Sequence, residues 1–464
     1  MSAERADYAN LTFSVAMTDV LDRELVGHID KGRSQEDLTF AYWRPSRGRE
    51  RMTAVLFKLN LPNENERLLE GNVSFTSDYL LRVLDECPPG CGIALIHSHF
   101  GPGWQGMSHD DVVAEHDRLA GAVAGRTKLP IVGLTWGTDG TWSARCWLRA
   151  GRRQYERPDA TTVRVIGGRL CMSYHPRLMQ AHAGTGSQVA TISVWGEAAQ
   201  QDLARVRVGI VGLGSVGSLI AEALARTGIQ HVTMIDADKL ELRNLDRTLG
   251  AELTDIGKYK VDIADRQARR ATTASTFDAV AVPKRIQEPD GYAAALACDV
   301  LLCCVDRPWP RHVLNVIANA HLIPVIDGGI LARFDARGRL AHVNWRIHTV
   351  GPGRACLYCL DAIRRGDVQL DRDGKLDDPD YIKGLSAEER ERYAGRNVFA
   401  FSMSVASHQV LQLVGLVSGN ARVGGMGPQT YHAYPGRMDV EDATACGDGC
   451  DLRDVTASAC DPVG

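Results

Sequence analysis

Apolar and polar residues alternate along this chain in a way that predicts strands interleaved with helices. Short apolar runs typical of buried strands lie at residues 53–59, 93–97, 131–136, 206–211 and 231–235. Helical spacing occurs at residues 76–84 and 218–227, and Gly228 is expected to end the second helix. From residue 206 onward the predicted strands and helices take turns, which is typical of βαβ units with a mostly parallel sheet. The pattern therefore predicts an α/β fold.

Length and local composition divide the chain. At 464 residues it exceeds one ordinary hydrophobic core, so more than one domain is expected. We expect a first domain over residues 1–158, a linker and lead-in over 159–200, and a second domain over 201–464. Residues 364–395 are highly charged and are expected to form an exposed insertion.

Composition narrows the class of protein. Hydrophobic residues make up 44% and charged residues 24%, which is ordinary for a globular protein. The net charge of −4 argues against nucleic acid as the main partner. The N-terminus has no apolar signal core, and no run of about 18 apolar residues occurs, so we expect a cytoplasmic protein without a membrane partner. Its twelve cysteines then point to metal or thiol chemistry.

The first candidate site lies at the end of the predicted strand 93–97. His97 and His99 are spaced i, i+2, so both side chains can project to one face of a strand. Ser108 is expected to cap a helix that carries Asp111 in its first turn. Two imidazoles and a carboxylate suit a catalytic Zn²⁺ that keeps one position open. The competing interpretation is a plain capping box beside two core histidines.

These residues resemble the JAMM (JAB/MPN) metalloproteases, which cleave at the C-terminal end of ubiquitin-like proteins. The family pattern is a Glu followed by H-x-H-x7-S-x-x-D. His97 and His99 match the histidine ligands, Asp111 the carboxylate ligand, and Ser108 the serine that supports the oxyanion. This chain has eight residues between His99 and Ser108, which leaves Asp110 as an alternative to Asp111.

The resemblance also implies an upstream glutamate that acts as general base on the zinc-bound water. Glu50 lies just before the predicted strand 53–59 and is our choice for this role. Cys87 and Cys91 flank a Pro-Pro-Gly turn, and we interpret them as ordinary thiols rather than as further ligands.

The second candidate site is a glycine-rich loop between a predicted strand and a helix. Gly212, Gly214 and Gly217 form G-x-G-x-x-G, which allows close backbone approach to phosphate at a helix N-terminus. Asp236 and Asp238 follow at a distance typical of ribose binding. The loop alone is a weak signal, and an NAD(P)- or FAD-dependent oxidoreductase is an alternative.

The residues after the loop resemble the E1/ThiF/MoeB superfamily over about residues 190–455. These enzymes use ATP to adenylate the C-terminal Gly-Gly carboxylate of a ubiquitin-like protein. The resemblance implies a Rossmann-like domain in which the three glycines line the phosphate loop and Asp236 and Asp238 flank the ribose. It also implies a Mg²⁺ ligand and groups that face the triphosphate: Asp306 for the metal, and Asn244, Arg247 and Lys260 for the phosphates.

Two departures from this family stand out. Many relatives supply an arginine from a helix before the first strand, and residues 192–201 lack it. Thioester-forming relatives usually carry a catalytic cysteine after the first Cys-x-x-Cys, yet no cysteine occurs between Cys359 and Cys446. Any thioester would require another thiol, such as Cys171 or Cys460, or another protein, so none is assigned.

The third candidate site consists of two close cysteine pairs. Cys356 and Cys359 form C-x-x-C, and Cys446 and Cys450 follow about 90 residues later with three residues between them. Superfamily relatives often carry a structural Zn²⁺ with this layout, and four thiolates suit a closed tetrahedral site. A redox C-x-x-C is the alternative, but its usual thioredoxin-like context is missing.

Together the sites predict a bifunctional enzyme. The first domain would trim or deconjugate the C-terminus of a small ubiquitin-like protein ending in Gly-Gly, and the second would adenylate it. The context would be conjugation with an E2-like protein, sometimes linked to antiviral defence, or sulfur transfer with a sulfur donor. Relatives of the second domain are commonly homodimers. The alternatives are the oxidoreductase with a metal-binding domain, and a non-catalytic scaffold that only binds ubiquitin-like proteins.

Overall fold

A computed structural model describes residues 11–32, 35–68, 73–151, 154–182, 184–335, 337–386, 389–390, 393, 397–419, 427–441 and 445–461. The chain forms two compact α/β units. Unit 1 comprises residues 1–180 with Thr456–Cys460, and unit 2 comprises Ala181–Val455 with the last residues. The start of the chain, on which the signal-sequence expectation depends, lies outside the described residues.

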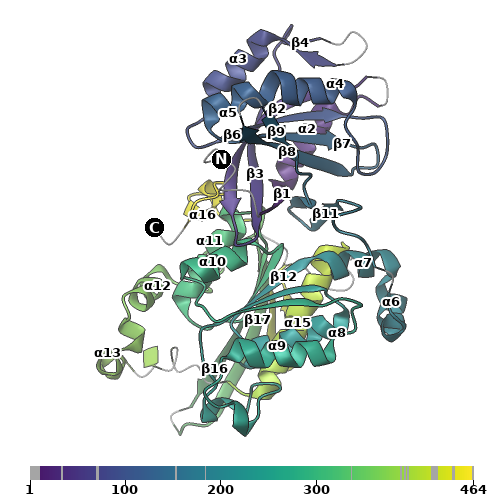
Figure 1. Cartoon of the computed structure of the whole chain (residues 1–464). Coiled ribbons are helices and arrows are strands. Elements are labelled where there is room, and N and C mark those ends of the chain that lie inside the picture. The colour runs from purple at the N-terminus through teal and green to yellow at the C-terminus, as the bar shows by residue number, and fades with distance from the viewer. Residues whose placement is uncertain are drawn as a thin grey trace. The chain divides into compact units, whose positions relative to one another are not determined.

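Unit 1 is built on a nine-stranded mixed sheet (Figure 1). In spatial order the strands are β11 (Leu170–Tyr174), β10 (Thr162–Ile166), β1 (Thr12–Thr18), β3 (Arg51–Asn60), β2 (Leu38–Arg47), β6 (Gly92–Ser98), β7 (Ile131–Trp136), β8 (Trp142–Gly151) and β9 (Gln154–Glu156). A separate short hairpin joins β4 (Arg67–Leu68) and β5 (Ser74–Phe75).

Helices cover both faces of this sheet. Helix α2 (Asp19–Ile29) packs Leu21, Leu25 and Ile29 into the core on one face. The other face carries α3 (Ser77–Glu86) and a continuous helical run of α4 (His109–Val112), the π-helix η1 (Val113–Ala120) and α5 (Gly121–Thr127). Helix α3 begins where predicted, because Thr76 Oγ1 accepts a hydrogen bond from the Tyr79 amide.

The expected linker over residues 159–200 is wrong in its first part. Strands β10 and β11 add to the edge of the unit 1 sheet, where β10 runs parallel to β1. The partner of β10 is almost 150 residues upstream, and β11 joins the sheet only through β10, so local sequence did not reveal that they extend this sheet. Beyond them lie η2 (Gly186–Gln188), α6 (Val189–Trp195) and α7 (Glu197–Arg205), which belong to unit 2.

Unit 2 is built on an eight-stranded sheet with a parallel core. In spatial order the strands are β14 (Asp278–Val282), β13 (His231–Ile235), β12 (Arg207–Val211), β15 (Val300–Cys303), β16 (Val325–Phe334), β17 (Leu340–Val350), β18 (Gln429–His432) and β19 (Arg437–Val440). The first five strands in this order, from β14 through β13, β12 and β15 to β16, are parallel to one another. Strands β17, β18 and β19 each run antiparallel to the strand before them. This order confirms the predicted α/β class and its Rossmann-like arrangement.

Two helical layers flank the unit 2 sheet (Figure 1). On one face, α8 (Ser215–Thr227) contacts both α9 (Lys260–Ala271) and α15 (Phe399–Ser418). Helices α10 (Pro289–Leu296) and α11 (Pro308–Ala320) enclose the large apolar core on the other. The short elements are η3 (Leu242–Asn244), η4 (Leu253–Asp255), α12 (Arg365–Arg372), η5 (Lys375–Asp377), α13 (Pro379–Gly384) and α16 (Asp451–Asp454).

Helix α15 differs from the expectation that no stretch resembles a membrane span. It has 20 residues and a mean hydropathy of 1.3, enough by length and composition to cross a membrane. Ser, His and Gln interrupt its apolar residues, so a count of consecutive apolar residues overlooked it. In the structure 56% of its apolar window is buried, and it packs against β16, β17 and α8 as a core helix does.

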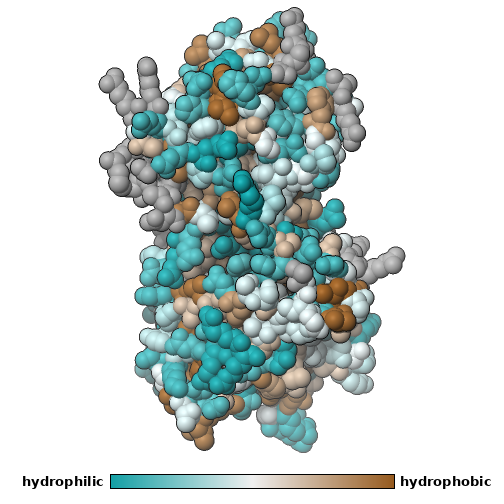
Figure 2. Space-filling view, turned by 45° about the vertical axis from the view of Figure 1, so that its right-hand side comes forward, coloured by the Kyte–Doolittle hydropathy of each residue, from teal (hydrophilic) through white to brown (hydrophobic). Residues whose placement is uncertain are grey.

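On the face of the molecule shown in Figure 2, hydrophilic side chains cover most of the surface, and apolar side chains lie in small separate groups. The charged segment expected at residues 364–395 is helical in α12 and α13 and turns mainly exposed side chains outward. Part of that segment lies outside the described residues.

Candidate functional site

Strand β6 and helix α4 bring the first three predicted ligands together. His97 lies near the end of β6, and His99 lies one residue beyond it, held in line by a hydrogen bond from its amide to the Trp136 carbonyl. Asp111 lies in α4, which starts after the loop that follows β6. The three ligand atoms all lie within 4.8 Å of one another.

The spacing of these atoms fits a tetrahedral metal ion. His97 Nε2 lies 3.2 Å from Asp111 Oδ1, His99 Nε2 lies 3.3 Å from Asp111 Oδ2, and the two Nε2 atoms are 3.1 Å apart. Bonds of about 2.0–2.1 Å to a tetrahedral ion would separate neighbouring N and O ligands by about 3.3 Å. The donor set and its geometry therefore both suit Zn²⁺.

The ligand group is partly buried, and its histidines change the pKa of its carboxylate. Burial alone would raise the pKa of the Asp111 carboxyl, but hydrogen bonds with His97 and His99 hold it well below its usual range. A capping box is also present, because Ser108 Oγ accepts from the Asp111 amide at 3.1 Å and the Ser108 amide donates to Asp111 Oδ2 at 2.7 Å. The capping and ligand interpretations of Ser108 and Asp111 thus coexist. Asp110 is exposed and is not in the ligand group.

Glu50, the predicted general base, does not lie at this group. It is exposed in the turn between β2 and β3. At the far end of β2, Leu38 pairs with His97, whereas Arg47 at the near end pairs with Met52. Nine residues of strand separate Leu38 from Arg47, about 30 Å at ~3.3 Å per residue. Glu50 therefore lies at the opposite end of these strands from the ligand group.

Glu36 is the carboxylate that the strand register places beside the ligands. The pairing of Leu38 with His97 continues through a hydrogen bond from the Ser98 amide to the Asp37 carbonyl. One more step sets Glu36 opposite His99, on the face shared by Leu38 and His97. Asp37 alternates to the other face and pairs with Lys31 and Arg67. Sequence alone could have shown that Glu36 also precedes a strand, but not which strand pairs with β6.

The glycine loop of unit 2 lies where the order of parallel strands reverses. Strand β12 has β13 on one side and β15 on the other, so the carboxyl ends of three strands meet there. A Cβ on Gly212 would lie 2.8 Å from the Cys304 carbonyl oxygen, and one on Gly217 would lie 1.9 Å from the Gly212 oxygen. Next to Gly214 the space is open. The loop thus packs tightly on the protein side and is open at the N-terminus of α8.

Asp236 and Asp238 have different partners at this edge. Asp236 directly follows β13, and its oxygens accept hydrogen bonds from the Leu213 amide at 2.6 Å and the Asp238 amide at 2.8 Å. Burial raises the pKa of Asp236, and nearby Lys260 opposes this. Asp238 is exposed, and its Oδ2 lies 2.8 Å from Lys260 Nζ. Asp236 therefore supports the glycine loop, while Asp238 pairs with Lys260.

The remaining predicted residues, Asn244, Arg247 and Asp306, all follow the glycine loop in sequence. Asp306 is exposed just after β15 and before α11. Asn244 ends η3, and its Oδ1 accepts from the Glu241 amide at 3.0 Å. Arg247 follows, and its Nη1 donates to the Arg243 carbonyl at 2.7 Å. Asp306 thus stands at the carboxyl edge of the parallel strands, where ligands of this fold bind.

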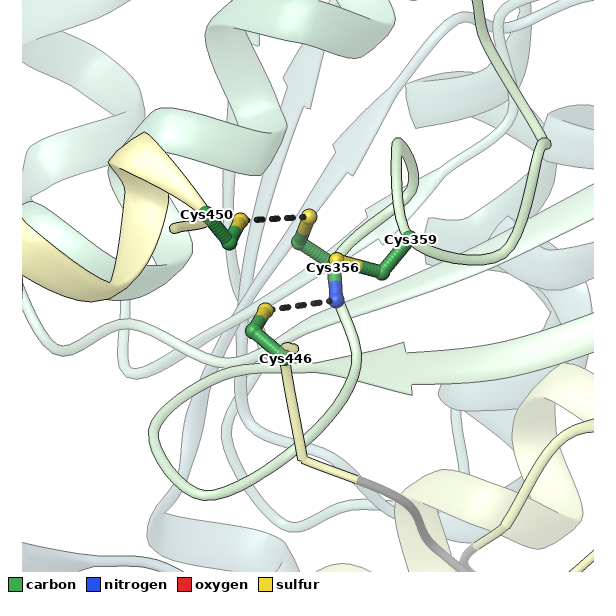
Figure 3. A group of neighbouring side chains, drawn as sticks. All are labelled: Cys356, Cys359, Cys446 and Cys450. Atoms are coloured by element: carbon green, nitrogen blue, oxygen red, sulfur yellow. Dashed lines mark hydrogen bonds between the residues drawn. The ribbon is translucent and has the colours of Figure 1, made fainter. Parts of the chain in front are cut away.

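The four predicted cysteines form one cluster, with their sulfur atoms turned toward one another (Figure 3). The sulfurs of Cys356 and Cys450 are 3.7 Å apart, against about 3.8 Å expected for thiolates at ~2.3 Å from a tetrahedral Zn²⁺. A hydrogen bond from Cys446 lowers the pKa of Cys356 to about 5, and the same bond raises the pKa of Cys446. The Cys356 amide also donates to Cys446 Sγ at 3.2 Å. Such a cluster suits a closed metal site.

Comparison with curated proteins finds relatives of part of the chain. The chain is 31% identical over 167 residues to molybdopterin-synthase adenylyltransferase of Escherichia coli, covering 35% of this chain and 62% of the relative. It is 30% identical over 141 residues to tRNA threonylcarbamoyladenosine dehydratase of E. coli, covering 30% of this chain and 52% of the relative. An adenylyltransferase and sulfurtransferase of Yarrowia lipolytica is 29% identical over 186 residues, with 40% and 43% covered. The chain thus spans about half the length of the curated relatives it matches.

Among solved structures, E. coli MccB with ATP aligns with a TM-score of 0.43 and 14% identity, covering 58% of this chain and 74% of that one. The model of the ThiF family matches residues 185–442, more than half of the chain and the whole of the parallel core of unit 2. The chain therefore belongs to the ThiF family.

Proposed function

We propose that unit 2 adenylates the C-terminal carboxylate of a small ubiquitin-like protein ending in Gly-Gly, using ATP and Mg²⁺. The observation that carries the proposal is the open glycine loop at the strand-order reversal, with Lys260 and Asp306 at the same edge. Family membership and two relatives named as adenylyltransferases support this reaction over the oxidoreductase alternative.

The chemistry follows from the groups at this edge. The substrate carboxylate oxygen forms a bond to the α-phosphorus, the bond from that phosphorus to the bridging oxygen breaks, and pyrophosphate leaves. The loop amides and the N-terminus of α8 bind the phosphates, and Lys260 and Arg247 offset the charge that develops on their oxygens. Asp306 would hold Mg²⁺, which would neutralise the leaving pyrophosphate.

The test is ATP–pyrophosphate exchange by the full chain in the presence of a ubiquitin-like protein ending in Gly-Gly. Lys260→Ala should lower exchange by roughly 10²-fold or more, because it removes a cation, 12% exposed, that would offset the charge on the phosphates. Lys258→Ala is the matched control, since Lys258 pairs with Asp255 and is 53% exposed two residues away. Exchange that survives Lys260→Ala, or nicotinamide-dependent redox activity without exchange, would count against the proposal.

For unit 1 we propose a zinc-dependent hydrolase that cleaves at the C-terminus of the same ubiquitin-like protein. The supporting observation is the set of ligand distances of 3.1 to 3.3 Å among His97, His99 and Asp111. Zn²⁺ held there would polarise a carbonyl and lower the pKa of coordinated water to about 7. Glu36 would take the proton from the attacking water and pass it to the leaving nitrogen. Ser108 Oγ, which already accepts from the Asp111 amide, keeps its own proton to donate to the developing oxyanion.

Cleavage is tested with a ubiquitin-like precursor that carries residues beyond Gly-Gly. The zinc-loaded chain should release the extension, and His99→Ala should abolish release and lower the zinc content by one ion per chain, because one of three ligands is lost. His109→Ala, an exposed histidine outside the ligand group, is the control. A wild type that holds zinc yet never cleaves would instead favour a binding scaffold.

The four-cysteine cluster is proposed as a structural zinc site. It ties residues 356–359, which follow β17, to residues 446–450 near the end of unit 2. All four positions are occupied by protein ligands, so no open position is left for a substrate. We further propose a homodimer and a cytoplasmic location, with an E2-like protein or a sulfur donor as the partner that takes the activated product.

A further inference from the structure

The helical run that carries Asp111 is fastened to the sheet of unit 1 by a buried ion pair that neither proposed reaction uses. Its members, Glu115 and Arg145, are 0% and 2% exposed. Arg145 Nε donates to Glu115 Oε2 at 3.0 Å, Arg145 Nη2 donates to Oε1, and the Trp147 indole donates to Oε2 at 2.8 Å. The carboxylate therefore accepts three N–H bonds, all from β8, and is held in one place.

Glu115 is the first fully buried side chain of this helical run. The run begins at His109, and Asp111 and the three residues after it are only partly buried. From Leu119 onward, buried apolar side chains hold the run against the core. On the side of the metal ligand, the first fully buried anchor is thus a charged group, about one turn after Asp111.

The sheet is shaped around the ion pair. A Cβ on Gly133 would lie 2.3 Å from Glu115 Oε1 and 2.6 Å from Arg145 Nε, so glycine at this position of β7 leaves room for the two charges. Buried ion pairs rarely stabilise a fold more than apolar residues of the same volume, because both charges lose their hydration. Their directional bonds nevertheless favour one arrangement among several that apolar packing would tolerate. Setting a register therefore accounts for this pair better than stability does.

The same arginine ties the helical run to the strand beside the histidines. Arg145 Nη1 donates to Thr135 Oγ1 at 2.5 Å, and Thr135 on β7 is the direct register partner of His97 on β6. Thr135 Oγ1 also lies 3.4 Å from His97 Nε2, the nitrogen assigned to the metal, so metal binding would replace this contact. The connection from Glu115 to the histidines therefore runs through the pairing of β8 with β7 and of β7 with β6.

The winding of the helix changes between the ligand and the apolar anchors. Glu115 lies four residues after Asp111, within the π-helical segment η1. The hydrogen bonds of a π-helix run from residue i to i+5, so such a segment alters the angular position of the turn before it relative to the turn after it. π-Helical segments are rare and occur frequently at functional sites. The ion pair thus holds the run at the place where its direction is set.

We propose that Glu115 and Arg145 are positioning residues that set the Asp111 helix against the sheet, so that its carboxylate meets the two histidines. The proposal rests on the metal site proposed for unit 1. Strand pairing fixes the histidines, whereas Asp111 comes from a separate helix. Without the ion pair, the apolar anchors would still hold that helix, but its first turn would be free to shift or rotate. Groups outside the ligand set that orient metal ligands typically contribute about 10–100-fold to metal affinity.

The test measures the Zn²⁺ affinity of the full chain by chelator competition, following the one ion that His99→Ala removes. Glu115→Met combined with Arg145→Met replaces both charges with apolar side chains of similar length, so no unpaired charge is buried and unit 1 should still fold. This paired variant should bind the ion about 10–100-fold more weakly. With Co²⁺ in the site, its visible absorption bands should also shift, because the carboxylate no longer meets the ion in the same geometry.

A double-mutant cycle shows whether the ion pair acts through Asp111. In an Asp111→Ala background the carboxylate is already lost, so the paired replacement should change the residual affinity by less than about twofold. Glu66→Gln is the matched control, because it removes an ion pair of unit 1, with Arg82, whose members both lie outside the helical run. It should leave the zinc affinity and the Co²⁺ bands unchanged.

The outcomes separate this proposal from the one on which it rests. If the paired variant binds Zn²⁺ as the wild type does, the positioning role is wrong while the metal site stands. An equal loss of affinity with and without Asp111 would also overturn that role, because the pair would then act on the histidines. If His99→Ala removes no zinc, the metal site itself fails. Should the paired variant not fold, Arg145→Lys keeps the charge but lacks the forked contact, and an unchanged zinc affinity in that variant would overturn the proposal.

Discussion

Glu36 and Glu50 show how a single residue's role depends on the strand that follows it. Each glutamate stands just before a strand of the β2–β3 hairpin, so both satisfy the pattern of a carboxylate ahead of an apolar run. Only the end of the hairpin that pairs with His97 is near the ligand group. The family pattern therefore indicated that a glutamate is needed. Which glutamate lies near the ligands could be decided only from the pairing of β2 with β6.

Substitution of the two glutamates tests this assignment at the residue scale. Glu36→Gln should lower precursor cleavage by roughly 10²–10⁴-fold, because glutamine cannot take the proton from water. Zinc content should be unchanged, since Glu36 is not in the ligand group. Glu50→Gln, about 30 Å away by strand length, should cleave as the wild type does. Loss of cleavage in Glu50→Gln alone would contradict the register argument.

Local motifs did identify most of the residues that the structure brings together. The histidines and Asp111 form one group, and the four cysteines another, in which the potential ligand atoms lie within 4.8 Å of one another. Thr135, Arg145 and Glu115 carried no such signal, because each residue type is common in strands and helices. They meet only because β6, β7, β8 and η1 pack together.

At the scale of elements, an ion pair fastens the β4–β5 hairpin to helix α3. Glu66 lies just before β4, and Arg82 on α3 donates to it through Nε at 2.8 Å and Nη2 at 2.5 Å. These bonds from Arg82 lower the pKa of Glu66 to about 2. A carboxyl with a lowered pKa stabilises the fold above its unfolded pKa, and that contribution is lost as the pH falls from about 4.5 to about 2.

Glu66→Gln should therefore destabilise unit 1 by about 1–2 kcal/mol at pH 7, allowing for solvent at the 25% exposed Arg82 side chain. The difference from the wild type should shrink toward zero near pH 2. Denaturant unfolding at several pH values measures it. Glu86→Gln is the control, because Glu86 is 49% exposed and lies 3.6 Å from the same arginine. A difference that stays constant with pH would refute the assigned role of the ion pair.

Elements were predictable where their signals are local. Thr76 caps α3, Gly228 ends α8 in the left-handed region, and β7 and β13 begin and end as predicted. Helix α8 starts three residues earlier than predicted, at Ser215 within the glycine loop, because the glycines themselves enter its first turn. Strands β10 and β11 were missed because they join the sheet only through the pairing of β10 with the distant β1.

At the scale of the whole molecule, two units with separate cores carry two separate sites. The ligand group of unit 1 lies at the C-terminal end of the interior strand β6. The glycine loop of unit 2 lies where the order of its parallel strands reverses. If both proposals hold, one chain would carry cleavage and activation of the same C-terminus. A segment near the end of the chain, Thr456–Cys460, belongs to unit 1, where the Ala457 carbonyl accepts from Arg44 Nη1.

The sequence by itself determined the α/β class, the glycine loop and the two groups of metal-ligating residues, because their members are close in sequence or follow recurring spacings. The tertiary structure alone decided that Glu36 and not Glu50 lies at the end of the hairpin that pairs with His97, that β10 and β11 extend the first sheet, and that Arg145 and Thr135 pack beside His97. The reason is physical. Spacing along the chain records short-range geometry, whereas strand pairing joins residues far apart in sequence and follows from the packing of the whole core.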